Sequence, residues 1–159
     1  MGEIGLRAVR DDDLDAIYDQ MRDPEAVRMA AFTAEDPDDR DAFDAHLVRL
    51  RTTPEILLRA ITVDGELAGT IASFVVDGDT EITYWLDRSW WGLGITTQAV
   101  ALFLDLVPVR PITARAASDN AGSLAVLRKT GFRPVGLEVA YATARGKEIE
   151  ETVLRLDGP

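Results

Sequence analysis

The chain has 159 residues, of which 47% are hydrophobic and 28% are charged. This length and composition are sufficient for one domain with a buried core, and we expect that domain to span residues 1–159. It has no cysteine and one histidine, so disulfides, a cysteine nucleophile and a multi-histidine metal centre are excluded, and we expect no metal. The formal net charge of −11 argues against a nucleic-acid partner, and the lack of a long apolar run argues against a membrane partner, so we expect a cytoplasmic protein.

The N-terminal third of the chain predicts a strand and two helices. Residues 4–10 alternate as in a strand. The acidic run 11–13 then places negative charge at the start of a helix, and we interpret it as a cap rather than a metal site. Pro24 interrupts the helical pattern. A polar, acidic loop over residues 33–41 follows, and periodicity predicts a second helix over residues 38–52.

The remainder predicts an antiparallel meander followed by alternating helices and strands. The pair Asp64-Gly65 is a strong hairpin signal, and Asp77-Gly78-Asp79 marks another turn. The expected elements are strands over 57–63, 67–76 and 81–86, a helix over 97–106, a strand over 112–117, a helix over 120–130, and strands over 133–139 and 150–156.

A glycine-containing turn, Trp91-Gly92-Leu93-Gly94-Ile95-Thr96-Thr97, joins the strand over 81–86 to the next helix. A turn that feeds a helix N-terminus leaves N–H groups unpaired, and the helix dipole suits them to a phosphate. Gly92 and Gly94 also lack the Cβ atoms that would hold a pyrophosphate away from the backbone. The alternative is a plain turn in which glycine supplies positive φ. The dinucleotide fingerprint and the nucleotide P-loop are excluded, because a third glycine and a Gly-Lys-Ser/Thr sequence are missing.

A second motif follows the strand over 112–117. Asp119 or Asn120 can cap a helix that ends at Gly131 and whose apolar side carries Leu124, Val126 and Leu127. Taken alone, this segment predicts a well-capped amphipathic helix and nothing more.

Together the two segments resemble motifs of the GNAT superfamily of N-acetyltransferases. Residues 91–96 resemble its acyl-CoA pyrophosphate loop, Gln/Arg-x-x-Gly-x-Gly/Ala, with Trp91 at the first position, as in the RimJ/RimL-like branch, and Thr96 at the last. Residues 120–132 resemble its Asn-x-x-Ser-x-x-x-Leu-x-Lys-x-Gly-Phe segment. The resemblance implies an α+β fold with a mixed, mostly antiparallel seven-stranded sheet flanked by about four helices. It also implies that the sheet is splayed between strands 4 and 5, where pantetheine enters.

The resemblance further implies acetyl-CoA as co-substrate and an amine acceptor, and it is compatible with a homodimer. The residues that it assigns to acetyl-CoA are Leu86, Asp87, Trp91, Gly92, Leu93, Gly94, Ile95, Thr96, Thr97, Asn120, Ser123 and Arg128. Among these, backbone N–H groups at Leu86 and Asp87 are expected to polarise the thioester carbonyl.

Acetyl transfer to an amine requires removal of a proton from nitrogen and stabilisation of the departing thiolate. Glu81 lies on the fourth strand, where many relatives carry a glutamate base, and burial beside Trp85 would raise its pKa. The alternative is an exposed strand glutamate. The tyrosine that many relatives use as acid is replaced by Leu127, so Ser123 is the candidate donor to sulfur. Tyr141 is a reserve, with packing at a strand end as its alternative role.

The sequence predicts fewer features of the acceptor pocket than of the acetyl-CoA site. In this superfamily the region around residues 28–33 lies over the acceptor, which makes Met29 and Phe32 candidates, with ordinary core packing as the alternative. His46 is interpreted as a surface or packing residue rather than a base.

We therefore predict an acetyl-CoA-dependent N-acetyltransferase, in which a primary amine of a protein N-terminus or a small molecule attacks the thioester directly. The alternative is a non-catalytic acyl-CoA-binding or regulatory module, which Leu127 and Thr96 keep open.

Overall fold

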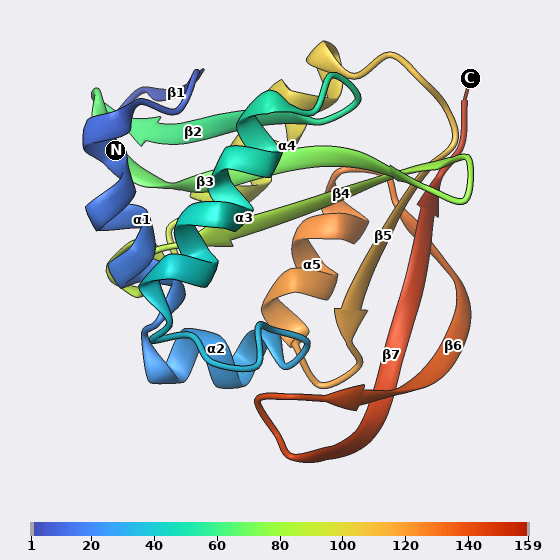
Figure 1. Ribbon diagram of the computed structural model, residues 1–159. Helices are drawn as coiled ribbons and strands as arrows, with labels where there is room; N and C mark the ends of the chain where they lie inside the picture. Colours follow the sequence, from blue (N-terminus) through green and yellow to red (C-terminus); the bar gives the residue numbers. More distant parts are fainter. Residues whose placement is uncertain (1, 159) are drawn as a thin grey trace.

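The computed structural model describes residues 2–158, which form a sheet flanked by helices (Figure 1). The elements in chain order are β1 (Ile4–Arg7), α1 (Leu14–Met21), α2 (Pro24–Ala30), α3 (Arg40–Thr52), β2 (Leu57–Val63), β3 (Glu66–Val76), β4 (Asp79–Leu86), α4 (Ile95–Leu106), β5 (Ile112–Ala117), α5 (Ala121–Lys129), β6 (Arg133–Ala142) and β7 (Lys147–Leu156). Short 3-10 turns cover Asp11–Asp13 and Arg88–Trp90.

The sheet has seven strands in the order β1-β2-β3-β4-β5-β7-β6. Every neighbouring pair is antiparallel except β4 and β5, which are parallel. These two strands pair only at Thr80 with Ile112 and at Glu81 with Thr113. Beyond that point they diverge, as Figure 1 shows. The predicted mixed seven-stranded sheet, splayed between its fourth and fifth strands, is therefore confirmed.

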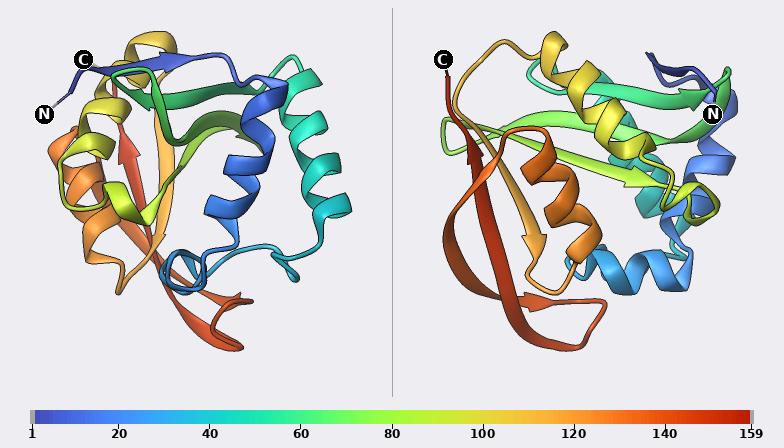
Figure 2. Two further views of the ribbon diagram at one scale, coloured as in Figure 1. Left: turned by 90° about the vertical axis from the view of Figure 1, so that its left-hand side faces the viewer. Right: turned by 180° about the vertical axis from the view of Figure 1, so that it is seen from behind.

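Helices cover both faces of the sheet, with α1 and α3 on one face and α4 and α5 on the other (Figure 2). The main core lies under α4 and α5, where Phe103 and Ile112 are fully buried. A smaller apolar cluster under α1 contains Val9, Ile17 and Ala60. Ile82 and Leu86 of β4 belong to the main core. Each large apolar side chain that is fully buried contributes about 1.5–3 kcal/mol, so this packing fixes β4 against α4 and α5. The β6–β7 hairpin extends past the helices.

The turn chemistry was correctly predicted, but one helix was missed. Asp64 and Gly65 have φ of 50° and 82°, as a two-residue hairpin turn between β2 and β3 requires. Residues 2–158 form five α-helices rather than about four, because Pro24 does more than interrupt the helical pattern. Proline is favoured at the first helical position, and the Asp23 side chain accepts a hydrogen bond from the Ala26 N–H at 3.0 Å. Pro24 therefore begins α2.

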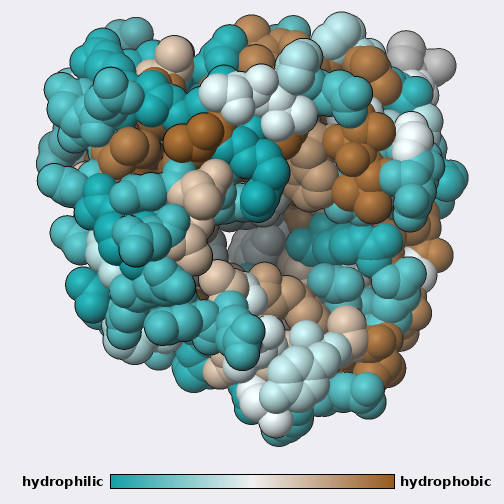
Figure 3. Space-filling model, viewed as in Figure 1, coloured by the Kyte–Doolittle hydropathy of each residue, from teal (hydrophilic) through white to brown (hydrophobic). Residues whose placement is uncertain are grey.

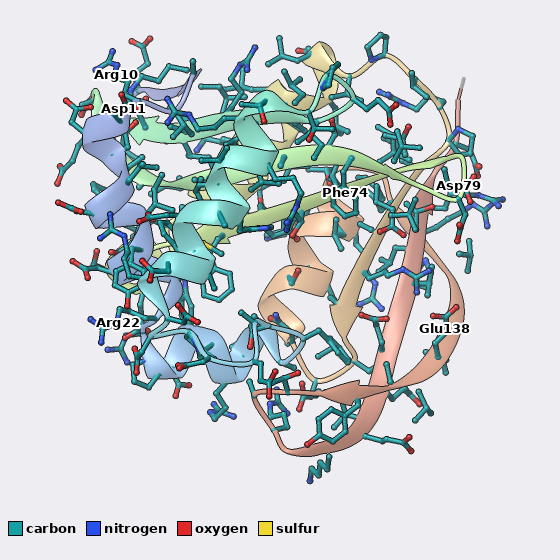
Figure 4. The ribbon with its side chains drawn as sticks, in the orientation of Figure 1. Arg10, Asp11, Arg22, Phe74, Asp79 and Glu138 are labelled. Carbon is teal, nitrogen blue, oxygen red and sulfur yellow. The ribbon has the colours of Figure 1, made fainter. Side chains whose placement is uncertain are left out.

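Two residues of the acidic run before α1, Asp11 and Asp13, pair with arginines and are part of the framework. Asp13 is buried, accepts a hydrogen bond from the Arg10 N–H at 2.7 Å and pairs with Arg7 at 2.7 Å. Asp11 pairs with Arg51 of α3 at 2.8 Å and lies at the outer end of this region (Figure 4). These contacts attach the start of α1 to β1 and α3.

Candidate active site

The glycine-containing turn enters α4 in the conformation that an anion site needs. Gly92 and Gly94 have φ of 79° and 77°, and a Cβ atom on either would meet nothing within 4 Å. Gly94 is the N-cap of α4 and no side chain caps the helix there. The N–H of Gln98 is the first to bond back to Gly94, at 3.3 Å. The N–H groups of the first turn therefore remain available for a ligand, with the helix dipole behind them.

A cavity of about 450 Å³ lies in front of this turn, between the N-termini of α4 and α5, the end of β4 and α2. Helices α4 and α5 lie together on this face (Figure 2). Most of the residues predicted to hold acetyl-CoA line the cavity: Leu86, Trp91, Gly92, Gly94, Ile95, Thr96, Thr97, Asn120 and Ser123. The two motifs, separate in sequence, thus face one cavity.

Three of the predicted residues do not line this cavity. The Asp87 side chain accepts hydrogen bonds from the Ser89 N–H and hydroxyl at 2.9 and 2.6 Å. Leu93 is 46% exposed, and Arg128 is exposed in the last turn of α5. Lys129, the next residue, lines the cavity and supplies a cation there.

The expected backbone donor at the end of β4 is Leu86 rather than Asp87. The Asp87 N–H already donates to the Ala68 carbonyl of β3 at 2.8 Å. Hydrogen bonds of an antiparallel pair alternate along a strand, so the Leu86 N–H points the other way, into the gap between β4 and β5. The indole N–H of Trp91 donates to the Leu86 carbonyl at 3.0 Å and holds the turn against this gap.

Tyr84 is a residue of this cavity that the sequence analysis missed. Its hydroxyl lies 2.7 Å from the Ser123 hydroxyl and donates to the Ser123 carbonyl at 3.3 Å. Burial raises the pKa of Tyr84 to about 12, although its hydrogen bond to Ser123 opposes the rise. Tyr84 follows the alternation of residues 81–86, but the pattern does not say which face of the strand meets the helices. The pair brings two hydroxyls together at the cavity wall.

The α5 N-terminus is tied to α2 by Asn120. Its side-chain oxygen accepts from the Ser123 N–H at 3.2 Å, and its amide donates to the Met29 carbonyl at 3.4 Å. The N-cap role predicted for Asn120 is therefore confirmed, and the helix missed in the sequence completes one wall of the cavity. Leu127, at the position of the relatives' tyrosine, is 1% exposed and packs in the main core.

The structure does not bring Glu81 or Tyr141 to the cavity. The Glu81 carboxylate pairs with Arg115 of β5 at 3.1 Å, and Arg115 also contacts Glu138 and Glu151. This cluster lies on the face opposite α5, with Glu138 on β6 (Figure 4). Burial raises the pKa of Glu151, although Arg115 opposes the rise. Tyr141 is 61% exposed near the end of β6.

A second cavity, of about 570 Å³, lies on the opposite face of β4, between α1, α3 and the loop over 31–39. Figure 3 shows a deep hollow in the middle of this face. Thr83 is exposed in the middle of β4 because it faces this cavity. Tyr84 and Trp85 line both cavities, and the Trp85 indole N–H donates to the Gln20 carbonyl at 3.0 Å. The two cavities therefore meet at β4.

The loop that covers the second cavity is fixed to α1. The Arg22 side chain donates to the Asp38 carboxylate at 2.8 Å, and the Tyr18 hydroxyl donates to the Asp38 carbonyl at 2.7 Å. Figure 4 shows Arg22 at the end of α1 beside this loop. Of the two acceptor candidates, Phe32 lines this cavity whereas Met29 lines the first; His46 lines the second as well.

Within residues 2–158, no group of three or more His, Cys, Asp or Glu side chains could hold a metal ion. No helix in this part of the chain has the length and apolar character needed to cross a membrane.

Comparison with known proteins identifies relatives for this arrangement. The family model described as "Acetyltransferase (GNAT) domain" matches residues 3–133. The mycothiol acetyltransferase of Clavibacter michiganensis subsp. michiganensis is 32% identical over 147 residues, which cover 76% of this chain and 47% of the relative. The chain thus spans about half the length of the curated relatives it matches.

Solved structures give the same architecture. Mycobacterium smegmatis RimJ, solved in complex with CoA-disulfide, superposes with a TM-score of 0.83 at 27% identity, covering 99% of this chain and 83% of RimJ. A RimL ribosomal L7/L12 acetyltransferase, in complex with CoA, superposes with a TM-score of 0.77 at 19% identity, covering 98% of this chain and 96% of RimL. The second likeness is one of fold alone.

Proposed function

The chain belongs to the GNAT acetyltransferase family, and on that premise we propose that it transfers an acetyl group from acetyl-CoA to a primary amine. Its fold is that of the RimJ/RimL-like branch, as the two motifs predicted. The observation that carries the proposal is the uncapped N-terminus of α4, whose positive-φ glycines face a cavity that also reaches the Tyr84–Ser123 pair. The complex of M. smegmatis RimJ with CoA-disulfide supports CoA as the ligand of this cavity.

The residues of the first cavity fit the pyrophosphate and the thioester of acetyl-CoA. The N–H groups at the start of α4 suit its pyrophosphate, and Lys129 adds a positive charge. Acetyl-CoA supplies an acyl group already activated as a thioester, so no protein nucleophile is required. The Leu86 N–H, directed into the gap between β4 and β5, is placed to donate to the carbonyl oxygen as negative charge develops there.

In the proposed reaction the amine nitrogen bonds to the acetyl carbon, the carbon–sulfur bond breaks, and the thiolate gains a proton while the nitrogen loses one. The Tyr84–Ser123 pair is our candidate to donate a hydrogen bond to the sulfur. A tyrosine whose pKa is about 12 cannot readily give up its proton to a thiolate, because a thiol has a pKa near 8.5 and the transfer costs roughly 5 kcal/mol. We infer that these hydroxyls stabilise the thiolate by hydrogen bonding and that water delivers the proton.

The acceptor amine is proposed to approach from the second cavity, which meets the first at Tyr84 and Trp85. The RimJ and RimL likenesses favour a protein N-terminus, and the likeness to mycothiol acetyltransferase favours a small-molecule amine. Either acceptor would lose its proton to solvent in this proposal, because Glu81 is engaged by Arg115.

Two measurements on one sample test the function. CoA at a hundredfold excess over its dissociation constant raises the free energy of unfolding by about 2.7 kcal/mol, and we expect NAD and ATP to raise it much less. Release of free thiol from acetyl-CoA in the presence of an amine panel then reports transfer. A melting curve that millimolar CoA leaves unmoved contradicts the CoA site. A CoA shift without thiol release for any amine identifies the non-catalytic acyl-CoA module instead, for which the loss of the relatives' tyrosine at Leu127 is the sequence argument.

A further inference from the structure

The walls of the second cavity are mainly apolar and come from six parts of the chain: α1, the loop over 31–39, α3, β2, β3 and β4. The large apolar side chains include Met21 of α1, Phe32 of the loop, Phe43 and Leu50 of α3, Leu58 of β2 and Trp85 of β4. At about 570 Å³ the cavity is in the range of small-molecule sites. Such walls favour a ligand that brings an apolar group out of water.

The cavity also offers hydrogen-bonding groups that the protein leaves unused. The Thr33 hydroxyl oxygen is buried without a partner among the described residues. The Arg49 guanidinium donates to Nδ1 of His46 at 2.8 Å, and a guanidinium can only donate, so Nδ1 is the acceptor nitrogen of a neutral ring. Burial and the charge of Arg49 lower the pKa of His46 and keep the ring neutral. Its proton is then on Nε2, where it can serve as a donor.

Charge in the cavity is sparse. Its charged lining residues are Asp36, Asp39 and Arg49, which sum to a net charge of −1. The Asp36 and Asp39 carboxylates each accept one backbone N–H bond, at 3.0 Å, and keep their charge. A net charge of −1 can balance one ammonium group, so a ligand with several ammonium groups would bury positive charge in excess of it, which is strongly unfavourable.

We propose that this cavity binds a small primary amine that carries a single ammonium group and an aromatic or branched apolar body. The apolar body would lie against α3 and the loop, and the amine would reach the first cavity at Trp85, where the cavities meet. This assignment of acceptor class rests on the proposed acetyltransferase function.

The experiment compares three amines with the full chain and acetyl-CoA, by thiol release. The probes are 2-phenylethylamine, ethylamine and spermidine. We expect kcat/KM for 2-phenylethylamine to exceed that for ethylamine by at least about tenfold, because one apolar group in a pocket is worth at least that factor. We expect kcat/KM for spermidine to be lower than that for 2-phenylethylamine. A preference for spermidine, or equal rates for the two monoamines, overturns the proposal.

A substitution on β4 that fills the cavity tests the proposal, and the same substitution outside the cavity is its matched control. Thr83→Phe places a ring in the cavity on a strand position that suits aromatic side chains, and Val48→Phe adds the same ring to α3 at an exposed position outside the cavity. Thr83→Phe is expected to lower kcat/KM for 2-phenylethylamine at least about tenfold, with the CoA-induced thermal shift unchanged, whereas Val48→Phe alters neither. Ala42→Leu, which narrows the cavity from α3, repeats the test if Thr83→Phe fails to fold.

Failure of the proposed function gives a different result from failure of this inference. If no amine releases thiol, the transferase function fails, and the cavity is then tested by titrating 2-phenylethylamine into CoA-loaded protein by NMR. Saturable binding that Thr83→Phe weakens supports the assignment. Absence of binding, or tighter binding of spermidine, overturns it.

Discussion

The two cavities on either side of β4 are built by different means. The first is made largely of backbone, in which two glycines at positive φ and the uncapped start of α4 present N–H groups to a ligand. The second is made of side chains contributed by α1, α3, the loop over 31–39 and three strands. A backbone site requires particular residue types at fixed spacing, since only glycine adopts these angles freely. A side-chain site requires only apolar residues of suitable size, so many sequences can build it.

This difference predicts how each cavity responds to substitution. A single change in the backbone site should remove binding, whereas single changes in the side-chain site should shift selectivity. It also explains why acetyl-CoA could be inferred from a motif and the acceptor could not.

The largest effect is expected from Gly94→Val. Gly94 has φ of 77°, which strains any other residue and a β-branched one most, and the valine side chain would occupy the open space in front of α4. We expect CoA affinity, measured by titration calorimetry, to fall at least about a hundredfold, or ~2.7 kcal/mol.

Gly65→Val is the matched control for backbone strain. Gly65 has φ of 82°, and a Cβ atom there also meets nothing within 4 Å, but it lies in the β2–β3 turn. Both variants should lose similar stability, about 1–2 kcal/mol, and only Gly94→Val should lose CoA. Equal CoA affinity in the two variants would refute the backbone site.

Much of the fold and of the backbone site could be predicted from the sequence, because local rules govern them. Asp64-Gly65, the glycines before α4 and the Asn120 cap depend on neighbours a few residues away. Tyr84 could not be predicted, since its partner Ser123 lies 39 residues further along and the facing of β4 is decided by tertiary packing. Helix α2 was missed because Pro24 was interpreted only as a break.

The next largest effect is expected at the hydroxyl pair. Tyr84→Phe removes one hydrogen bond to the departing thiolate, worth about 1.5–3 kcal/mol for a charged acceptor, and should lower kcat about tenfold to a hundredfold. CoA affinity should change little. Because the pKa of Tyr84 is about 12, the ratio of parental to variant rate should stay constant up to about pH 10.

Tyr141→Phe is the control for this loss. It also removes a tyrosine hydroxyl, but from an exposed side chain on β6. Its kcat should equal the parental value. If Tyr141→Phe lowers kcat and Tyr84→Phe does not, Tyr141 rather than Tyr84 donates the hydrogen bond to the departing sulfur.

A smaller effect, on stability alone, is expected where α1 is anchored to β1. Asp13→Asn breaks the two-point pair with Arg7, with oxygen–nitrogen distances of 2.7 and 2.9 Å, and should lower the free energy of unfolding by about 2 kcal/mol at pH 7. The hydrogen bond from Arg7 lowers the pKa of Asp13 below its ordinary 3.8. The pair therefore stabilises the fold above that pH, and its contribution is lost as pH falls through the lower, folded-state pKa. Urea titrations of parent and variant should converge in acid; a gap that persists there contradicts the ion pair.

The smallest effect is expected from Glu81→Gln, the substitution that separates an enzyme base from a structural carboxylate. A general base must lie within hydrogen-bond reach of the proton it takes, directly or through one water, and its removal typically costs about a hundredfold to ten-thousandfold in rate. The Glu81 carboxylate instead pairs with Arg115 at 3.1 Å. Within residues 2–158, Glu81 is not among the residues that line either cavity.

We therefore expect turnover of Glu81→Gln to stay within about threefold of the parent, a change of ~0.6 kcal/mol, and to match that of Glu138→Gln, which removes another partner of Arg115. The measurement is the pH dependence of kcat/KM with two acceptors of different pKa. A rising limb that moves with the acceptor belongs to the amine, as loss of its proton to solvent requires. A limb that stays fixed in the parent and disappears in Glu81→Gln alone would establish Glu81 as the base and require its carboxylate to leave Arg115 during the reaction.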